Sequence, residues 1–278
     1  MMKIFLTVRN RLSITKKCIK AIQKHSTLPY QLYVYNNQTN YKIDEHFNYF
    51  CDLYKNGLIT QLTFNTDAST FNAFSKATAC NIFGEQHQQD PEKDKIMFMV
   101  MLDNDIILTP GWDKKLLEAW KYVIKNKIEN IKVIGQLPGG IKNRKQKFQI
   151  NEELIGRVGK LGGSGLWSVR SNFFDDVGFL DLKLLVGHSK KHDQLYWRAL
   201  DQSTGGQPYI MGLNTKLGIH CGRMSGSVCN KLTQNKGKSK DHKLELVKFK
   251  DADEKIGKME FNEFYKKIIK DTFLNSDW

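Results

Sequence analysis

The sequence predicts an α/β protein built on a mostly parallel central sheet with helices on its faces. Segments with strand-like composition alternate with segments of helical periodicity, as in parallel α/β sheets. The run 96–102 holds seven apolar residues without a polar side chain, which is typical of a strand buried on both faces. That run ends in Asp103-Asn104-Asp105, and α/β sheets bind their ligands at the carboxyl ends of strands.

The strand and helix signals follow one another along the chain. Strands are predicted over 3–8, 31–35, 59–64, 96–102, 132–137, 166–169, 209–211 and 216–219. Helices are predicted from 13 onward, over 70–83, after Thr109-Pro110, after Ser171, and over 193–200 and 253–273. We expect Ser13, Thr109 and Ser171 to act as N-caps. The polar tract 85–95 indicates a surface linker.

The domain organisation follows from the same alternation. We expect one domain over 1–225, in which 1–137 form a regular half and 138–225 a less regular half. Residues 226–278 are expected to form a basic loop and an amphipathic helix packed on that domain. The lysines of this helix lie opposite its apolar side chains, which favours core capping over membrane attachment.

Composition narrows the location and the partners. Five cysteines without CxxC spacing predict neither a disulfide framework nor a zinc site, and favour a reducing cytoplasm. The apolar N-terminal stretch is too short for a signal peptide, and no run approaches the ~20 apolar residues of a membrane span. A formal charge of +14 could attract nucleic acid, an anionic cell-wall polymer or a membrane surface. The basic segments 142–147 and 231–243 carry much of it, although such runs are usually solvated loops.

The acidic triplet predicts a cation site. Asp103 and Asp105 offer hard oxygen ligands to Mg2+ or Mn2+, which could neutralise a nucleotide diphosphate. The alternative is an Asp-rich turn that only caps the following element.

Several short motifs, taken in order, resemble the family 2 glycosyltransferases of the GT-A fold. They are Arg9-Asn10-Arg11 after the first strand, Asn36-Asn37 after the second, the acidic triplet, the segment 174–181, and His192-Asp193 opening a helix with Tyr196-Trp-Arg198. The resemblance covers roughly residues 3 to 225, and the order and spacing make the joint match more specific than any single motif. It implies a Rossmann-like sheet with an acceptor-side extension. In this layout 1–137 are the nucleotide-sugar-binding half and 138–225 the acceptor half.

The resemblance also implies roles for the acidic residues. Asp103 and Asp105 match the Asp-x-Asp motif, in which the second carboxylate binds the metal and the first contacts the donor ribose or the ion. Asp193 matches the general base that acts on the acceptor hydroxyl, with His192 in place of the usual Glu. His220, in Gly218-Ile-His-Cys-Gly, matches a late histidine that ligates the metal or touches the diphosphate. A lone histidine near a late strand also fits a structural role.

The nucleotide side follows from the same resemblance. Thr7, Arg9 and Asn37 lie where the family holds the nucleotide, and Asn72 falls where a helix asparagine approaches the base. The family usually carries an acidic residue where Asn36 and Asn37 stand, so the identity of the base stays open.

The expected activity is an inverting, metal-dependent transfer of a sugar from a nucleotide-diphosphate sugar to a hydroxyl acceptor. The acceptor is expected to be polyanionic: either DNA with hydroxymethylated bases, as in a phage-infected cell, or a phosphate-bearing envelope polymer of a bacterium. Two alternatives stay open. One is a nucleotidyltransferase on a related sheet, against which the lack of a Gly-rich phosphate loop counts. The other is a basic, non-catalytic nucleic-acid-binding protein.

Overall fold

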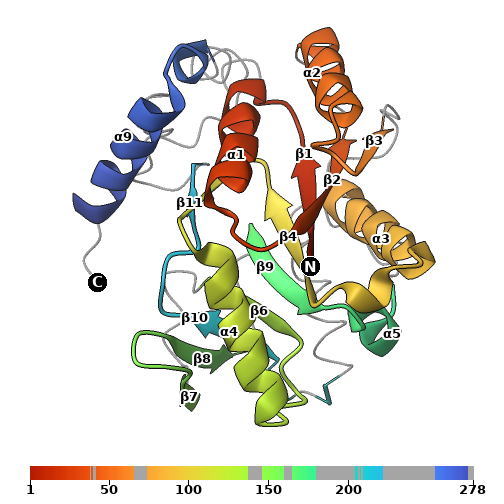
Figure 1. Ribbon diagram of the computed structural model, residues 1–278, viewed down its shortest axis with the longest axis vertical. Coiled ribbons are helices and arrows are strands. Elements are labelled where there is room, and N and C mark those ends of the chain that lie inside the picture. Colours follow the sequence, from red (N-terminus) through yellow and green to blue (C-terminus); the bar gives the residue numbers. More distant parts are fainter. Residues whose placement is uncertain are drawn as a thin grey trace.

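A single nine-stranded sheet forms the centre of the molecule (Figure 1). The structure is a computed structural model and describes residues 1–37, 39, 42–65, 74–136, 146–159, 165–179, 204, 205, 207, 209–221 and 254–274. The strand order is β3-β2-β1-β4-β9-β6-β10-β8-β7. The strands are β1 Met2–Val8, β2 Tyr30–Asn37, β3 Gln61–Asn65, β4 Phe98–Asp103, β6 Val133–Gln136, β7 Gln146–Gln149, β8 Ile155–Gly159, β9 Leu166–Arg170 and β10 Ile210–Leu213.

The sheet is mostly parallel, as predicted. β3, β2, β1 and β4 run parallel to one another, and β6 is parallel to β10. β9 lies antiparallel between β4 and β6, and β8 is antiparallel to β10 and β7. The long apolar run 96–102 therefore supplies β4 at the centre of the sheet, flanked by β1 and β9.

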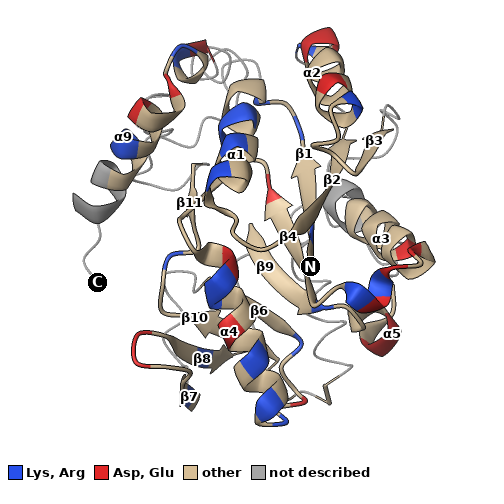
Figure 2. Cartoon of the chain, in the orientation of Figure 1, with Lys and Arg blue, Asp and Glu red and all other residues tan. Residues whose placement is uncertain are grey.

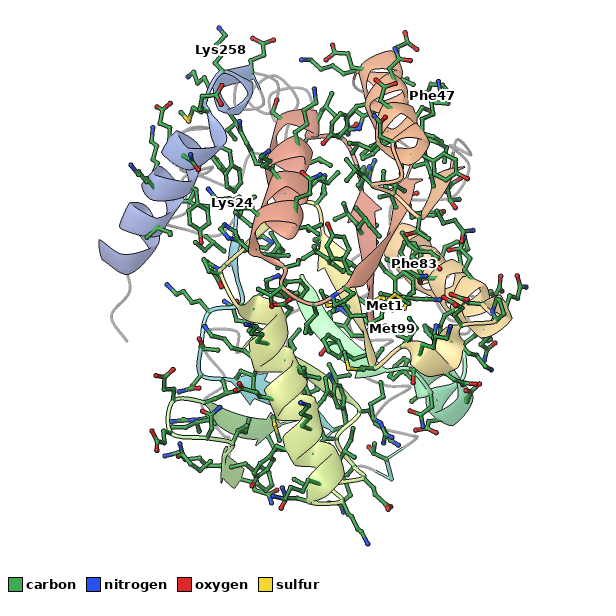
Figure 3. All side chains as sticks on the ribbon, viewed as in Figure 1. Met1, Lys24, Phe47, Phe83, Met99 and Lys258 are labelled. Carbon is green, nitrogen blue, oxygen red and sulfur yellow. The ribbon has the colours of Figure 1, made fainter. Side chains whose placement is uncertain are left out.

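Alternate residues of the central strands pack against different helices. On one face, Ile4 of β1 and Val100 of β4 join a core cluster with α1 Leu12–His25, α4 Trp112–Lys125 and α9 Phe261–Leu274. On the other face, Phe5 and Met99 pack with Phe83 of α3 Phe74–Gln89 and with α5 Phe173–Val177. Figure 3 shows the labelled residues Phe83 and Met99 near one another. This period of two is the pattern of a sheet covered on both faces.

Buried hydrogen bonds tie α4 to the sheet and to the α1–β2 turn. Trp120 Nε1 donates to Ser168 Oγ at 2.9 Å, and that hydroxyl donates to the Ile134 carbonyl at 2.8 Å. The fully buried Asp113 carboxylate accepts from the backbone N–H groups of Thr27 and Leu28. These contacts fix the second half of the sheet against the first.

The helix starts differ from the sequence prediction. The N-cap of α1 is Arg11 and that of α4 is Gly111, both in the left-handed region and both without a side-chain cap hydrogen bond. The prediction that Ser13 and Thr109 cap these helices is wrong. Thr109 Oγ1 instead donates to the Lys216 carbonyl at 2.7 Å. The N-cap of α5 is Asn172 and not Ser171.

Other helix and strand boundaries also differ from those predicted from the sequence. The tract 85–95 is not a linker over its whole length, because α3 continues to Gln89 and a 3-10 turn follows at Lys93–Lys95. His87 in that extension is buried and contacts the Ser171 carbonyl at 2.8 Å. The sequence prediction missed helix α2 Ile43–Lys55, strands β7 and β8, and a short strand β5 Ile106–Leu108. In the predicted helix 253–273, the chain leaves the helical conformation at 258–260 before α9 begins.

A two-stranded ribbon stands beside the main sheet. β5 pairs antiparallel with β11 Gly218–His220, so that Ile106 lies opposite His220 and Leu108 opposite Gly218. The ribbon connects the acidic triplet at the end of β4 with a segment more than a hundred residues later. None of the helices in the described part of the chain combines the length and apolar composition that a membrane crossing requires.

Candidate functional site

Asp103 ends the central strand β4 at the carboxyl edge of the sheet. Its Cα partner in β1 is Thr7, and its backbone N–H donates to the Gly165 carbonyl at 2.9 Å. Thr7, Asp103 and Trp167 line the same small cavity, and Phe83 and Met101 are also part of its lining. The structure thus brings two of the predicted nucleotide-site residues, Thr7 and Asp103, together on neighbouring strands.

Asp105 and His220 meet across the ribbon. The Asp105 carbonyl accepts from the Cys221 N–H at 2.7 Å, which anchors the end of β11 against the triplet. The Nε2 atom of His220 lies 3.5 Å from Oδ1 of Asp105. The Asp105 side chain is only 10% exposed, whereas that of His220 is 38% exposed. A predicted pair separated by 115 positions in the sequence (220 minus 105) is therefore in contact.

Arg11 is a third member of this cluster that the sequence prediction did not assign. Its guanidinium forms an ion pair with Oδ2 of Asp105, the oxygen that His220 does not contact. Arg11 and the preceding Asn10 both have positive φ, 53° and 51°. Non-glycine residues in that region carry conformational strain that the surroundings must hold. The signal was present in the Arg9-Asn10-Arg11 motif, but spacing alone does not tell which arginine reaches the carboxylate.

Asn104 holds the strained loop in place. Its Nδ2 donates to the Asn10 carbonyl at 3.2 Å and to Thr15 Oγ1 at 2.8 Å. Thr15 in turn donates through Oγ1 to the Arg11 carbonyl at 2.9 Å. The middle residue of the triplet therefore positions the β1–α1 loop, while its two neighbours present carboxylates.

Cys18 lies directly behind the acidic residues. Its thiol is fully buried and approaches the Asp103 carbonyl at 3.9 Å. Burial raises the pKa of this thiol far above its ordinary value, and the carboxylates of Asp105 and Asp103 raise it further. Cys18 is consequently a neutral thiol, neither a nucleophile nor a thiolate metal ligand.

An amide cluster lies at the ends of β2 and β3. Asn65 Nδ2 donates to Asn37 Oδ1 at 3.1 Å, and Thr39 donates through its hydroxyl to Oδ1 of Asn36. The Asn10 N–H donates to Thr39 Oγ1 at 3.3 Å, which links this cluster to the loop that carries Arg11. Asn36 and Asn37 are both buried. Asn65 is a contact of the predicted residue Asn37 that the sequence did not reveal, because it depends on the register of two parallel strands.

The residues that the structure describes include only part of the predicted site. Arg9 is half-buried, and burial lowers the pKa of its guanidinium. Asn72 and Asp193 lie outside the described residues.

Asp105 and His220 fit a divalent cation whose remaining ligands come from a bound nucleotide diphosphate and water. Asp105 and His220 offer an oxygen and a nitrogen donor side by side. In the described part of the chain, no group of three or more His, Cys, Asp or Glu side chains is close enough to hold a metal ion. Mg2+ and ions like it often take only one or two carboxylates, with substrate phosphates and water completing the shell. The residues therefore fit a cation that a nucleotide diphosphate helps to bind, in competition with Arg11 for Asp105.

Comparison with known proteins identifies the fold. No protein-family model and no curated protein sequence matches the chain. Among solved structures, GalNAc-T7 with UDP, GalNAc and Mn2+ is similar over 100% of this chain and 58% of its own, with 13% identity and a TM-score of 0.52. The molecule has the fold of GT-A glycosyltransferases, as the sequence predicted.

Two further structures show weaker similarity. TarS 1-349 from S. aureus matches over 78% of this chain and 59% of its own, with 13% identity and a TM-score of 0.48. The mannosyltransferase PcManGT from Pyrobaculum calidifontis, solved with GDP-Man and Mn2+, matches over 69% and 50%, with 10% identity and a TM-score of 0.45. The chain spans less than two thirds of the length of each of these three structures.

Proposed function

We propose that the protein is a metal-dependent glycosyltransferase that moves a sugar from a nucleotide-diphosphate sugar to a hydroxyl acceptor with inversion. The observation that carries this proposal is the contact between Asp105 and His220 at the carboxyl edge of a GT-A sheet. Asp103 ends the central strand β4 and is paired with Thr7 of β1. Both lie at the edge of the sheet where α/β folds bind nucleotides. The structure of GalNAc-T7 contains UDP, GalNAc and Mn2+, which supports a nucleotide-sugar donor and a divalent metal.

The proposed roles divide between the two halves of the chain. Asp105 and His220 would hold Mn2+ or Mg2+, which would supply positive charge against the departing diphosphate. Asp103 would contact the donor ribose or the ion, and Thr7, Arg9, Asn37 and Asn72 would hold the nucleotide. Asp193 would accept the proton of the acceptor hydroxyl while the new glycosidic bond forms and the bond to the diphosphate oxygen breaks.

The acceptor is proposed to be polyanionic, because 43 lysine and arginine residues outnumber 29 acidic residues. Figure 2 shows basic residues on α1 and α4. If the acceptor is DNA with hydroxymethylated bases, duplex binding will weaken steeply as salt rises, because phosphate contacts release counterions. A flat salt dependence would leave a phosphate-bearing envelope polymer as the proposed acceptor. A cytoplasmic location is part of the proposal, and the free thiols of Cys18 and Cys51 are consistent with it.

The decisive experiment is slow donor hydrolysis. The protein is incubated with a panel of nucleotide sugars and Mn2+, and release of free nucleotide is followed. We expect hydrolysis of one nucleotide class that falls by about a hundredfold or more in Asp105→Asn, because the carboxylate charge near the diphosphate is lost. The matched control is Asp175→Asn, a carboxylate on α5 that is not part of the site.

Two outcomes would contradict the proposal. Undiminished hydrolysis in Asp105→Ala would remove the acidic triplet from the chemistry. Release of pyrophosphate with nucleotide attached to an acceptor would indicate nucleotidyl transfer instead. Asp193→Asn tests the base separately, since it should abolish transfer to an acceptor while donor binding, measured by calorimetry, stays unchanged.

A further inference from the structure

A second pocket lies away from the acidic triplet, between the start of α4, the β10–β11 connection and α9. Its volume is about 460 Å³, within the range of small-molecule sites. It is lined by Thr109, Pro110, Lys115, Asn214, Thr215, Lys216, Ile219, Tyr265 and Ile269. Figure 1 shows α9 running beside α1 and β11, with α4 below them.

The charged side chains that line the pocket are both lysines, and no acidic residue is among the nine. Lys115 Nζ donates to Thr215 Oγ1 at 3.0 Å, which fixes one ammonium group at the wall. Lys216 is partly buried, and burial lowers the pKa of its ammonium group. Two cationic groups at the wall of one cavity favour an anionic ligand, which would offset the desolvation of Lys216.

The hydroxyl group of Tyr265 also favours a ligand that carries acceptor oxygens. Tyr265 lines the pocket from α9, and its hydroxyl is buried without a hydrogen-bond partner among the described residues. A buried donor left unsatisfied is destabilising, so native structures rarely keep one. A ligand with several acceptor oxygens would give this hydroxyl a partner.

The remaining wall of the pocket is suited to contact the carbon atoms of a ligand. Pro110, Ile219 and Ile269 contribute apolar surface, and Asn214 contributes an amide able to pair with hydroxyl groups. The 14-residue helix α4 begins just beyond Pro110, and its positive end adds to the field at the same wall. An anionic head with a short hydroxylated body matches this distribution.

The pocket is distinct from the site at Asp105. Ile219 lines the pocket, whereas the next residue of β11, His220, contacts Asp105. Successive side chains of a strand point to opposite faces, so the two sites lie on either side of the β5–β11 ribbon.

We propose that this pocket binds a phosphate group carried by a small hydroxylated carbon body, held by Lys115, Lys216 and Tyr265. Phosphate suits the set, since its oxygens can accept hydrogen bonds from both ammonium groups and from the phenol at once. Such a group can belong to a free sugar phosphate or to a phosphate of the acceptor. The inference does not depend on sugar transfer.

The test uses ribose 5-phosphate as the probe and ribose as the matched uncharged compound, at constant ionic strength. Calorimetry of the full chain is expected to detect ribose 5-phosphate and not ribose. Lys115→Gln and Lys216→Gln are each expected to weaken binding about tenfold or more, as the loss of one charge-assisted hydrogen bond requires. The control is Lys114→Gln, which changes an exposed lysine one position outside the pocket wall.

Tyr265→Phe supplies a readout that does not depend on charge. Without ligand, this variant should be as stable as the parent or more stable, because it removes an unsatisfied buried hydroxyl. It should nevertheless weaken ribose 5-phosphate binding severalfold. Equal binding of ribose and ribose 5-phosphate, or unchanged binding in both lysine variants, would overturn the proposal.

Two further experiments distinguish this site from the proposed donor site and identify the source of the phosphate. Asp105→Asn should lose donor hydrolysis but keep Lys115-dependent ribose 5-phosphate binding, so either proposal can fail alone. If the phosphate belongs to the acceptor, Lys115→Gln will raise the acceptor KM and leave donor hydrolysis unchanged. If it belongs to a free ligand, ribose 5-phosphate will change donor hydrolysis in the parent and not in Lys115→Gln.

Discussion

Asp105 is shared between two basic side chains that approach different oxygens. Arg11 pairs with Oδ2 and His220 lies 3.5 Å from Oδ1, and the carboxylate is nearly buried. A guanidinium in this position gives the carboxylate a positive partner when no other cation is near. The strained backbone at Asn10 and Arg11, held by Asn104, keeps that partner in reach.

Replacing Arg11 should therefore strengthen cation binding. In Arg11→Gln the carboxylate loses its internal partner, and we expect Mn2+ affinity, measured by electron paramagnetic resonance, to rise about tenfold, corresponding to about 1.4 kcal/mol of relieved competition. Arg157→Gln, which changes an exposed arginine of β8, should leave the affinity unchanged. An unaltered Mn2+ affinity in Arg11→Gln would show that the guanidinium does not compete for Asp105.

His46 makes stability depend on pH. It is fully buried on α2, and both ring nitrogens have no hydrogen-bond partner among the described residues. Burial, together with the charges of Lys16 and Lys42, lowers the pKa of His46 to about 4. Between that value and the ordinary pKa near 6.5, the unfolded chain binds more protons than the folded one, so stability falls as pH falls.

The size of this effect can be measured with one substitution. Between pH 7 and pH 4.5 we expect His46 to contribute a loss of up to about 3 kcal/mol in the free energy of unfolding. His46→Phe should remove that part of the dependence in urea titrations at several pH values. Burial also lowers the pKa values of His25 and His87, so a smaller dependence of the same sign should remain. An identical pH profile in the variant would contradict the assignment to His46.

The β5–β11 ribbon is the element that assembles the site. It pairs Ile106 with His220 and thereby fixes the imidazole beside Asp105. Gly218 allows the two strands to approach, since a Cβ atom there would lie 2.6 Å from Ile106 Cγ2 and 3.3 Å from Leu166 Cδ2. The close approach, rather than backbone conformation, requires glycine at this position.

Gly218→Ala should accordingly disturb both stability and the site. Overpacking in a buried position typically costs about 1–3 kcal/mol, which urea unfolding can detect. The double variant Gly218→Ala with Ile106→Ala removes the clashing methyl group, so its destabilisation should be smaller than the sum of the two single effects. Additive effects would mean that Gly218 is not limited by Ile106.

The whole molecule is organised by one continuous sheet. Residue 137, the proposed border between the nucleotide and acceptor halves, does not divide the sheet, because β4 of the first half pairs directly with β9 of the second. The buried chain from Trp120 through Ser168 to the Ile134 carbonyl joins the same regions. The two halves of the sequence therefore pack together in one sheet, with no structural boundary between β4 and β9.

We therefore expect the described sheet to unfold in a single transition. Urea curves followed by far-UV circular dichroism and tryptophan fluorescence should coincide, as they do for two-state domains. Hydrogen exchange should protect β2 and β8, near opposite edges of the sheet, up to similar free energies of opening. Early loss of protection in β8 alone would indicate that the acceptor half unfolds independently.

The order of residues along the chain was enough to predict the central part of the fold. The apolar run before Asp103 predicted the buried strand β4, and the alternation of segments predicted a mostly parallel α/β sheet. Uninterrupted apolar residues have few folded solutions other than burial on both faces, so this signal is local and strong. Helix starts were predicted less well, because polar residues such as Ser13 and Thr109 serve many local hydrogen bonds besides caps.

Tertiary structure alone decided which side chains meet. The pairing of β5 with β11 brings His220 to Asp105, and the left-handed conformation at Asn10 and Arg11 brings a guanidinium to the same carboxylate. Likewise, Lys115, Lys216 and Tyr265 share a pocket only because α4, the β10–β11 connection and α9 converge. Strand register and helix packing arise from contacts distant in sequence, and no local pattern of residues encodes them.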